Sequence, residues 1–325
     1  MRGGRMRAVA GLSWALLTGC STMGTESGLP PLAIRGSTAT LEIAPVLLAA
    51  RDHYGPGATV KNGGIGDLAA PGPSGQGVGE SVDLATHAET QALRYSVSRP
   101  DIRIILTVTE GRYRIVARRS AGIADLADLK GKRVATLATT SAGYFLARML
   151  AQAGLSFADI EPVRISPIEN MAGALARREV DAVAIWEPHA GNAVHAIGDD
   201  SIEFAGEGVY RELFNLNTTA ATLADPQKRK GIVAFIRAVR ASAERTRRDP
   251  APAQALVAET SGLSSDEVLR AWPTLAFPAR LAPDLLDVLV AEEEWLAAQD
   301  KRPPRSRATL AQLIDASVYE EALRP

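Results

Sequence analysis

The stretch that decides the fold reads VDAVAIWEP, from Val180 to Pro188. Its apolar part is short and ends at a turn that carries a tryptophan, an acid and a proline, which is typical of a buried β-strand. A helical pattern over residues 167–178 directly precedes it. This order of helix and strand predicts an α/β fold with largely parallel strands.

Similar short apolar runs recur along the chain and are separated by helical patterns. They cover residues 32–35, 102–108, 113–118, 133–137 and 162–165. The clearest helix begins with Ser141 as its cap and stops at Gly154. A second helix start is expected after residues 36–40, where hydroxyl side chains again follow a strand. The pattern therefore predicts several strand-to-helix turns along the same chain.

The carboxyl-terminal third has a helical period throughout. Asp225 and Pro226 open a helix, Ser264 and Glu267 fit a capping box, and residues 285–298 form a further amphipathic run. These signals predict a helical layer. By contrast, residues 62–79 are rich in glycine and proline and predict a loop.

Composition excludes several classes of protein. Hydrophobic residues make up 46% of the 325, which is enough for a large core divided into two lobes. The 36 basic and 37 acidic residues nearly cancel, so no nucleic-acid partner is expected. A phosphate-loop motif is absent, and the four histidines show no metal-ligand spacing. We therefore expect no metal and no cofactor.

The amino terminus has the pattern of a secretion signal, which we assign to residues 1–19. Three arginines precede an apolar run over residues 8–17. A membrane-spanning helix is the alternative, but a span needs about 20 apolar residues and this run is interrupted by glycine and serine. Secretion is therefore the stronger interpretation.

Residues 17–20, Leu-Thr-Gly-Cys, resemble a bacterial lipobox, in which the cysteine is lipidated. Cys20 is the only cysteine of the chain and cannot form an internal disulfide. The resemblance implies a mature chain that begins at Cys20, is held on a membrane surface by its acyl chains and is spaced from it by a polar tether over residues 20–31.

Residues 125–194 resemble the substrate-binding proteins for aliphatic sulfonates, taurine and nitrate, which are related to thiamine-precursor binding proteins. Three landmarks carry the resemblance: residues 128–135 (DLKGKRVA), residues 154–160 (GLSFADI) and the VDAVAIWEP stretch. Residues 50–57 and the glycine-rich segment 62–79 depart from the family pattern, which makes ligand contacts from the amino-terminal lobe less secure.

The family implies a type II periplasmic-binding-protein fold: two α/β lobes joined by two crossovers, with a helical C-terminal layer and a ligand bound between the lobes. We assign residues 32–113 and 215–325 to the first lobe and residues 114–214 to the second. Residues 113–118 and 215–219 are the expected crossovers.

Ten residues are candidates for binding the ligand. Hydroxyls near two helix starts could bind an oxyanion together with backbone N–H groups, although capping is the simpler role for Ser141. The family also places contacts around Thr86 and His87. Trp186 could form an apolar wall or belong to the core, and Glu187 lies where open α/β sheets bind ligands. The set is Ser37, Thr38, Thr86, His87, Thr139, Thr140, Ser141, Trp186, Glu187 and Asn217.

The expected function is capture of a small organic anion or zwitterion, such as a sulfonate or taurine, for an ABC importer with permease and ATPase subunits. Nitrate or a pyrimidine precursor of thiamine is the alternative ligand, and a ligand-sensing adaptor is the alternative role. Enzymes resemble this family, but the desulfinase type needs a thiol, and Cys20 is assigned to the anchor. We therefore expect a monomeric, extracytoplasmic protein without catalytic residues.

Overall fold

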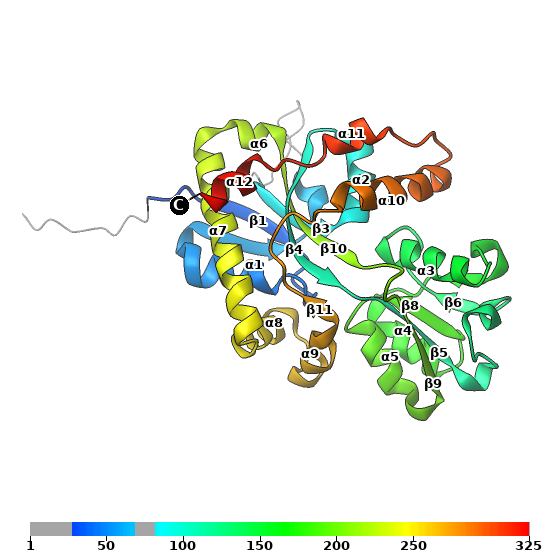
Figure 1. Ribbon diagram of the computed structural model, residues 1–325. Helices are drawn as coiled ribbons and strands as arrows, with labels where there is room; N and C mark the ends of the chain where they lie inside the picture. Colours follow the sequence, from blue (N-terminus) through cyan, green and yellow to red (C-terminus); the bar gives the residue numbers. More distant parts are fainter. Residues whose placement is uncertain (1–27, 69–81, 325) are drawn as a thin grey trace, which may run out of the picture.

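The computed structural model describes residues 28–68 and 82–324, which form two α/β lobes (Figure 1). The predicted signal peptide, Cys20 and residues 21–27 of the predicted tether lie outside the described residues. So do residues 69–79 of the glycine-rich segment. The described part of that segment contains the end of a strand and a short 3₁₀ helix, Ile65–Leu68.

The first lobe is built on a six-stranded sheet in the order β11-β4-β10-β3-β1-β2. Its strands are β1 (Leu32–Gly36), β2 (Ala58–Asn62), β3 (Leu84–Ala88), β4 (Ile102–Gly111), β10 (Glu212–Thr219) and β11 (Leu275–Ala276). The second lobe holds a five-stranded sheet in the order β7-β6-β8-β5-β9. Its strands are β5 (Arg114–Arg118), β6 (Arg133–Ala135), β7 (Glu161–Val163), β8 (Ala182–Ile185) and β9 (Ser201–Ala205).

The chain crosses between the lobes at Arg112 and Tyr113 and again over residues 206–211. The crossovers expected at residues 113–118 and 215–219 are therefore wrong, because nearly all of these residues belong to β5 and β10. Each crossover delivers the chain to the edge of the other sheet that faces the cleft. As a result β5 and β10 run antiparallel to their neighbours, and the sheets are mixed rather than largely parallel.

Helices cover both sheets, and the carboxyl-terminal ones return to the first lobe (Figure 1). In the first lobe and its return they are α1 (Ala44–Leu48), α2 (Glu89–Ser98), α6 (Ala220–Ala224), α7 (Pro226–Arg248), α8 (Ala251–Ser261), α9 (Ser265–Ala271), α10 (Leu285–Gln299), α11 (Arg307–Ala311) and α12 (Ser317–Leu323). In the second lobe they are α3 (Ser141–Gln152), α4 (Met171–Ala176) and α5 (His189–Ile197). The helical layer predicted from the sequence is confirmed.

The caps of this layer form as the sequence predicts. Asp225 accepts hydrogen bonds from the backbone N–H groups of Gln227 and Lys228 at the start of α7. Ser264 and Glu267 form the reciprocal capping box of α9. These polar contacts satisfy backbone donors that the first helical turn leaves unpaired.

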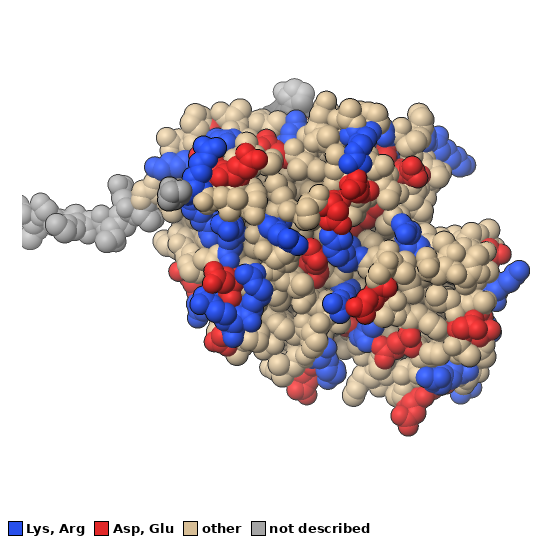
Figure 2. Space-filling model, viewed as in Figure 1, with Lys and Arg blue, Asp and Glu red and all other residues tan. Residues whose placement is uncertain are grey.

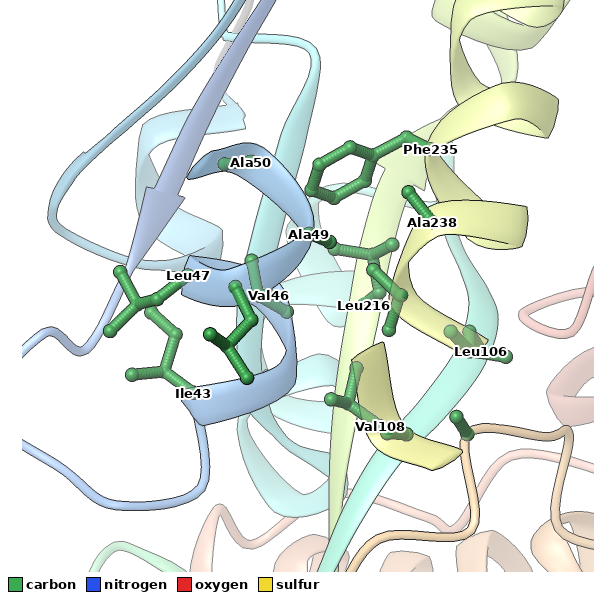
Figure 3. Close-up of a cluster of buried hydrophobic side chains, with 14 of the residues drawn as sticks. Ile43, Val46, Leu47, Ala49, Ala50, Leu106, Val108, Leu216, Phe235 and Ala238 are labelled. Carbon is green, nitrogen blue, oxygen red and sulfur yellow. The ribbon is translucent and has the colours of Figure 1, made fainter. Parts of the chain in front are cut away.

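Packing of α1 against α7 forms the centre of the first lobe's core (Figure 3). Val46 and Ala49 face Phe235 and Ala238 of α7, while Leu216 of β10 closes the cluster from the sheet. Phe235 is fully buried and packs edge to face against Tyr54 with ring centroids 5.7 Å apart. This core holds the turn after β1, which contributes to the cleft.

The surface in Figure 2 mixes acidic and basic side chains over both lobes, in keeping with the near-neutral net charge. Within residues 28–68 and 82–324, no helix is long and apolar enough to cross a membrane.

Candidate ligand-binding site

A cavity of about 60 Å³ lies between the two lobes. Its lining comes from the turn after β1, from β3 and α2, from β10, from the first crossover and from two turns of the second lobe. These residues are Ser37, Thr40, Glu42, His87, Ala88, Gln91, Tyr113, Thr140, Ser141, Trp186, Glu212 and Phe214. Larger hollows exist, but the one beside α1 and α8 is lined by the first lobe alone and the one beside β6 and β7 by the second alone.

Strand direction explains why polar residues collect at this cavity. Strands β1, β3, β6 and β8 all end at the edges of the sheets that face the cleft, so the turns that follow them meet there. This is the edge at which open α/β sheets bind ligands. It places Ser37, His87, Thr140, Ser141 and Trp186, five of the predicted residues, in the cavity wall.

The turn at the start of α3 differs in detail from the prediction. Thr140 is the cap, because its Oγ1 accepts the N–H of Ala142 at 3.2 Å, whereas Ser141 is the first helical residue. The Ser141 hydroxyl is instead 2.9 Å from the Tyr113 hydroxyl. A side chain of the second lobe is thus bonded to the crossover at the cavity wall.

The turn after β1 does not lead directly into a helix. Thr40 donates a hydrogen bond to the carbonyl of Ser37 at 3.0 Å, and α1 begins later, at Ala44, without a side-chain cap. The helix predicted after this turn forms, but it starts later than expected: α1 begins at Ala44 and continues as a π-helical stretch to Tyr54. Ser37 and Thr40 contribute hydroxyl groups to the cavity from the turn that precedes it.

His87 is neutral and presents a donor. Burial lowers the pKa of its imidazole to about 4, and Nδ1 accepts the N–H of Ala88 at 3.0 Å. Because Nδ1 accepts, the proton of the neutral ring is assigned to Nε2. His87 can therefore donate one hydrogen bond to a ligand in the cavity.

Four predicted residues do not line the cavity. Thr38 donates to Asn62 at 3.2 Å, and Thr139 is exposed beside the second-lobe hollow. Thr86 and Asn217 are fully buried in the first sheet, and the Asn217 amide donates to the carbonyl oxygens of Ala85 and Asn215. These positions support the sheet and its turns.

Glu187 also does not line the cavity. Its carboxylate forms an ion pair with Arg114 and accepts the N–H of Gly191 at 2.9 Å, and the side chain is 1% exposed. Glu187 therefore contacts an arginine and a backbone N–H group and does not face the cavity. Arg114 could not be connected with it from the sequence, because Arg114 begins β5 and Glu187 follows the end of β8, and these two paired strands lie far apart along the chain.

Sequence reasoning missed the two acids that do face the cavity, Glu42 and Glu212. They are 3% and 5% exposed, and the Oε2 atom of each is buried with no hydrogen-bond partner among the described residues. A signal was available for Glu42, which interrupts an apolar stretch between Leu41 and Ile43; Glu212 follows Arg211 and had no such signal. Glutamate is rarely buried without a partner.

Burial controls the charge of both acids. It raises the pKa of Glu42 to about 7, and it raises the pKa of Glu212 well above its ordinary value, with the nearby Glu42 and Glu89 carboxyls adding to the effect. The Tyr113 hydroxyl lies close to this pair, and burial raises its pKa as well. Near neutral pH the two carboxyls of the ligand-free cavity therefore carry little negative charge, and they can ionise further when a cation binds beside them.

Apolar rings complete the wall. Trp186 and Tyr113 are tilted against each other with centroids 5.8 Å apart, and Tyr113 packs edge to face on Tyr210 at 5.3 Å. Among the described residues, no group of histidine, cysteine, aspartate and glutamate could hold a metal ion. The arrangement suits a small polar organic molecule held by hydroxyls, carboxyls and ring faces.

A family model described as NMT1/THI5 like matches residues 78–253. The chain belongs to the NMT1/THI5-like family. Among curated relatives of this family member, a putative aliphatic sulfonates-binding protein of Escherichia coli (strain K12) is 41% identical over 75 residues, which are 23% of either chain. The chain thus matches about a quarter of the length of that relative.

Solved structures share the fold of this family member over nearly its whole length. The alkanesulfonate-binding protein SsuA from Xanthomonas axonopodis pv. citri, bound to MOPS, gives a TM-score of 0.66 at 24% identity, covering 88% of this chain and 98% of that one. The periplasmic nitrate-binding protein NrtA from Synechocystis PCC 6803 gives 0.67 at 12%, covering 90% and 88%. The predicted periplasmic-binding-protein fold is confirmed.

The same fold also occurs in an enzyme. The desulfurization enzyme DSZB gives a TM-score of 0.61 at 15% identity, covering 90% of this chain and 99% of that one. The fold alone therefore does not separate binding from catalysis.

Proposed function

We propose that this protein is the extracytoplasmic solute-binding component of an ABC importer and that its solute is a small organic zwitterion or anion of the sulfonate class. One observation carries the proposal: a cavity between two lobes, walled by both and by the crossover that joins them. A ligand in such a cavity contacts both lobes at once, so its binding energy favours the arrangement that encloses it.

The cavity wall favours a zwitterion over a bare anion. Ser37 and the Nε2–H of His87 supply hydrogen-bond donors for an acidic group, but no lysine or arginine is among the described residues that line the cavity. Nitrate would find no lysine or arginine there, and the Glu42 carboxyl, whose pKa is about 7, would repel it once ionised. The likeness to sulfonate-binding and nitrate-binding proteins supports the class of protein, and the wall supports the choice within it.

Anchoring through Cys20 and delivery to a permease and an ATPase complete the proposal. They rest on the secretion signal, the lipobox and the likeness to a solved ligand-binding component of an ABC-type import system. Lipidation would keep the receptor close to the membrane without a spanning helix.

Calorimetry tests the proposed function. Purified protein is titrated with taurine, alkanesulfonates, nitrate and pyrimidines, and we expect saturable binding of one molecule per chain for at least one organic sulfonate. Absence of heat from every compound at millimolar concentration contradicts the proposal.

A further inference from the structure

Two carboxyl groups in the cavity have no cationic partner in the described structure. Glu42 belongs to the turn after β1, and Glu212 begins β10 at the end of the second crossover. Both lie against Gly111: a Cβ placed there would be 2.9 Å from Oε2 of Glu212 and 3.7 Å from Oε1 of Glu42. The two acids therefore face the same small space from two elements far apart in sequence.

Two other buried acids have cationic partners: Glu187 is paired with Arg114, and Glu293 is held by both Arg302 and Arg305. Glu89 and Glu292 have no such partner among the described residues, but neither lines the cavity, and both accept hydrogen bonds from neutral groups. Glu42 and Glu212 lack a cationic partner and also line the cavity, and the Oε2 atom of each has no hydrogen-bond partner among the described residues. This combination of a missing partner and access to the cavity distinguishes the two acids.

A buried carboxylate without a partner is costly, and a ligand that brings a cation into the cavity removes that cost. We infer that Glu42 and Glu212 bind the positively charged nitrogen of the solute, a primary ammonium or a protonated amino-heterocycle. The inference rests on the proposed function, because it names the part of the solute that the cavity selects.

The remaining wall fits this orientation. Tyr113 and Trp186 present aromatic rings beside the acids, and a cation is attracted to such ring faces. The Ser37 hydroxyl and the Nε2–H of His87 remain for the acidic end of a zwitterion. Acceptors and donors for both ends are therefore present in one cavity.

The test uses two pairs of compounds. The two members of each pair differ only in carrying an amino group or a methyl group at the same position. Taurine is compared with propane-1-sulfonate, and 4-aminopyrimidine with 4-methylpyrimidine, by calorimetry at pH 8. The proteins are the wild type, Glu42→Gln, Glu212→Gln and the control Glu161→Gln, an exposed glutamate on β7 that has the same change of charge. Circular dichroism confirms that each variant is folded before it is titrated.

We expect the amino-bearing member of at least one pair to bind wild type and Glu161→Gln about tenfold tighter or more, as a charge-assisted hydrogen bond predicts. Both cavity variants should lose most of this preference.

Equal binding of both members to the wild type overturns the inference and leaves the proposed function standing, as does a preference that survives in both cavity variants. Tighter binding of propane-1-sulfonate would mean that protonated carboxyls donate to an anion, which also overturns it. If none of the four compounds binds, the proposed function fails for these solutes and the inference falls with it.

Discussion

Replacement of Glu42 by glutamine should change how the stability of the ligand-free protein depends on pH. In the native state burial raises the pKa of this carboxyl from 4.5 to about 7. Between these values the native carboxyl binds a proton more tightly than the unfolded one, so the wild type loses stability as pH rises through this range. The full difference corresponds to about 3 kcal/mol and is reached just above pH 7. Glutamine carries no charge at any pH and removes this loss.

Urea unfolding at pH 5 and pH 8 measures the effect. We expect the wild type to lose about 2.5 kcal/mol more than Glu42→Gln between the two conditions, because nearly 1 kcal/mol of the full difference is already lost at pH 5. Glu212 adds to this difference, since the Glu42 carboxyl that helps to raise its pKa is absent from the variant. His87, with a pKa of about 4, is neutral at both pH values and does not contribute. The exposed control Glu161→Gln should behave as the wild type. A difference between wild type and variant below about 1 kcal/mol would refute the burial argument. Burial of Glu42 would then destabilise the wild type between the two pH values by less than half of the expected value of about 2.5 kcal/mol.

Three further predictions concern other parts of the molecule. Cys20→Ala should release the protein into the soluble extracytoplasmic fraction, and a variant that still sediments with membranes contradicts the lipobox. Ligand should reduce the radius of gyration as the lobes close, whereas superposable scattering curves with and without saturating ligand exclude this motion. Phe235→Ala should destabilise the first lobe by about 3–5 kcal/mol, because it removes a fully buried ring from the contact between α1 and α7; a loss below about 1 kcal/mol in urea unfolding would mean that the core refills the space.

Local patterns determined much of the fold. The VDAVAIWEP stretch forms β8 and its turn, Asp225 caps α7, and Ser264 with Glu267 caps α9, because strands, caps and turns depend on neighbours within a few residues. The same patterns predicted polar turns after strands, and five residues in or beside these turns line the cavity. Which strands run antiparallel depends on where the chain crosses between lobes, and the sequence placed both crossovers a few residues too late.

The charges of the cavity were decided by tertiary structure alone. Glu187 was predicted as a ligand contact, but strand pairing brings Arg114 beside it. Glu42 and Glu212 were not among the predicted site residues, but the fold places both against Gly111, in a cavity whose described lining contains no lysine or arginine. The pKa of a carboxyl depends on its burial and on charges brought near it by distant segments. The sequence shows that an acid is present, but only the fold determines whether a cationic side chain lies beside it.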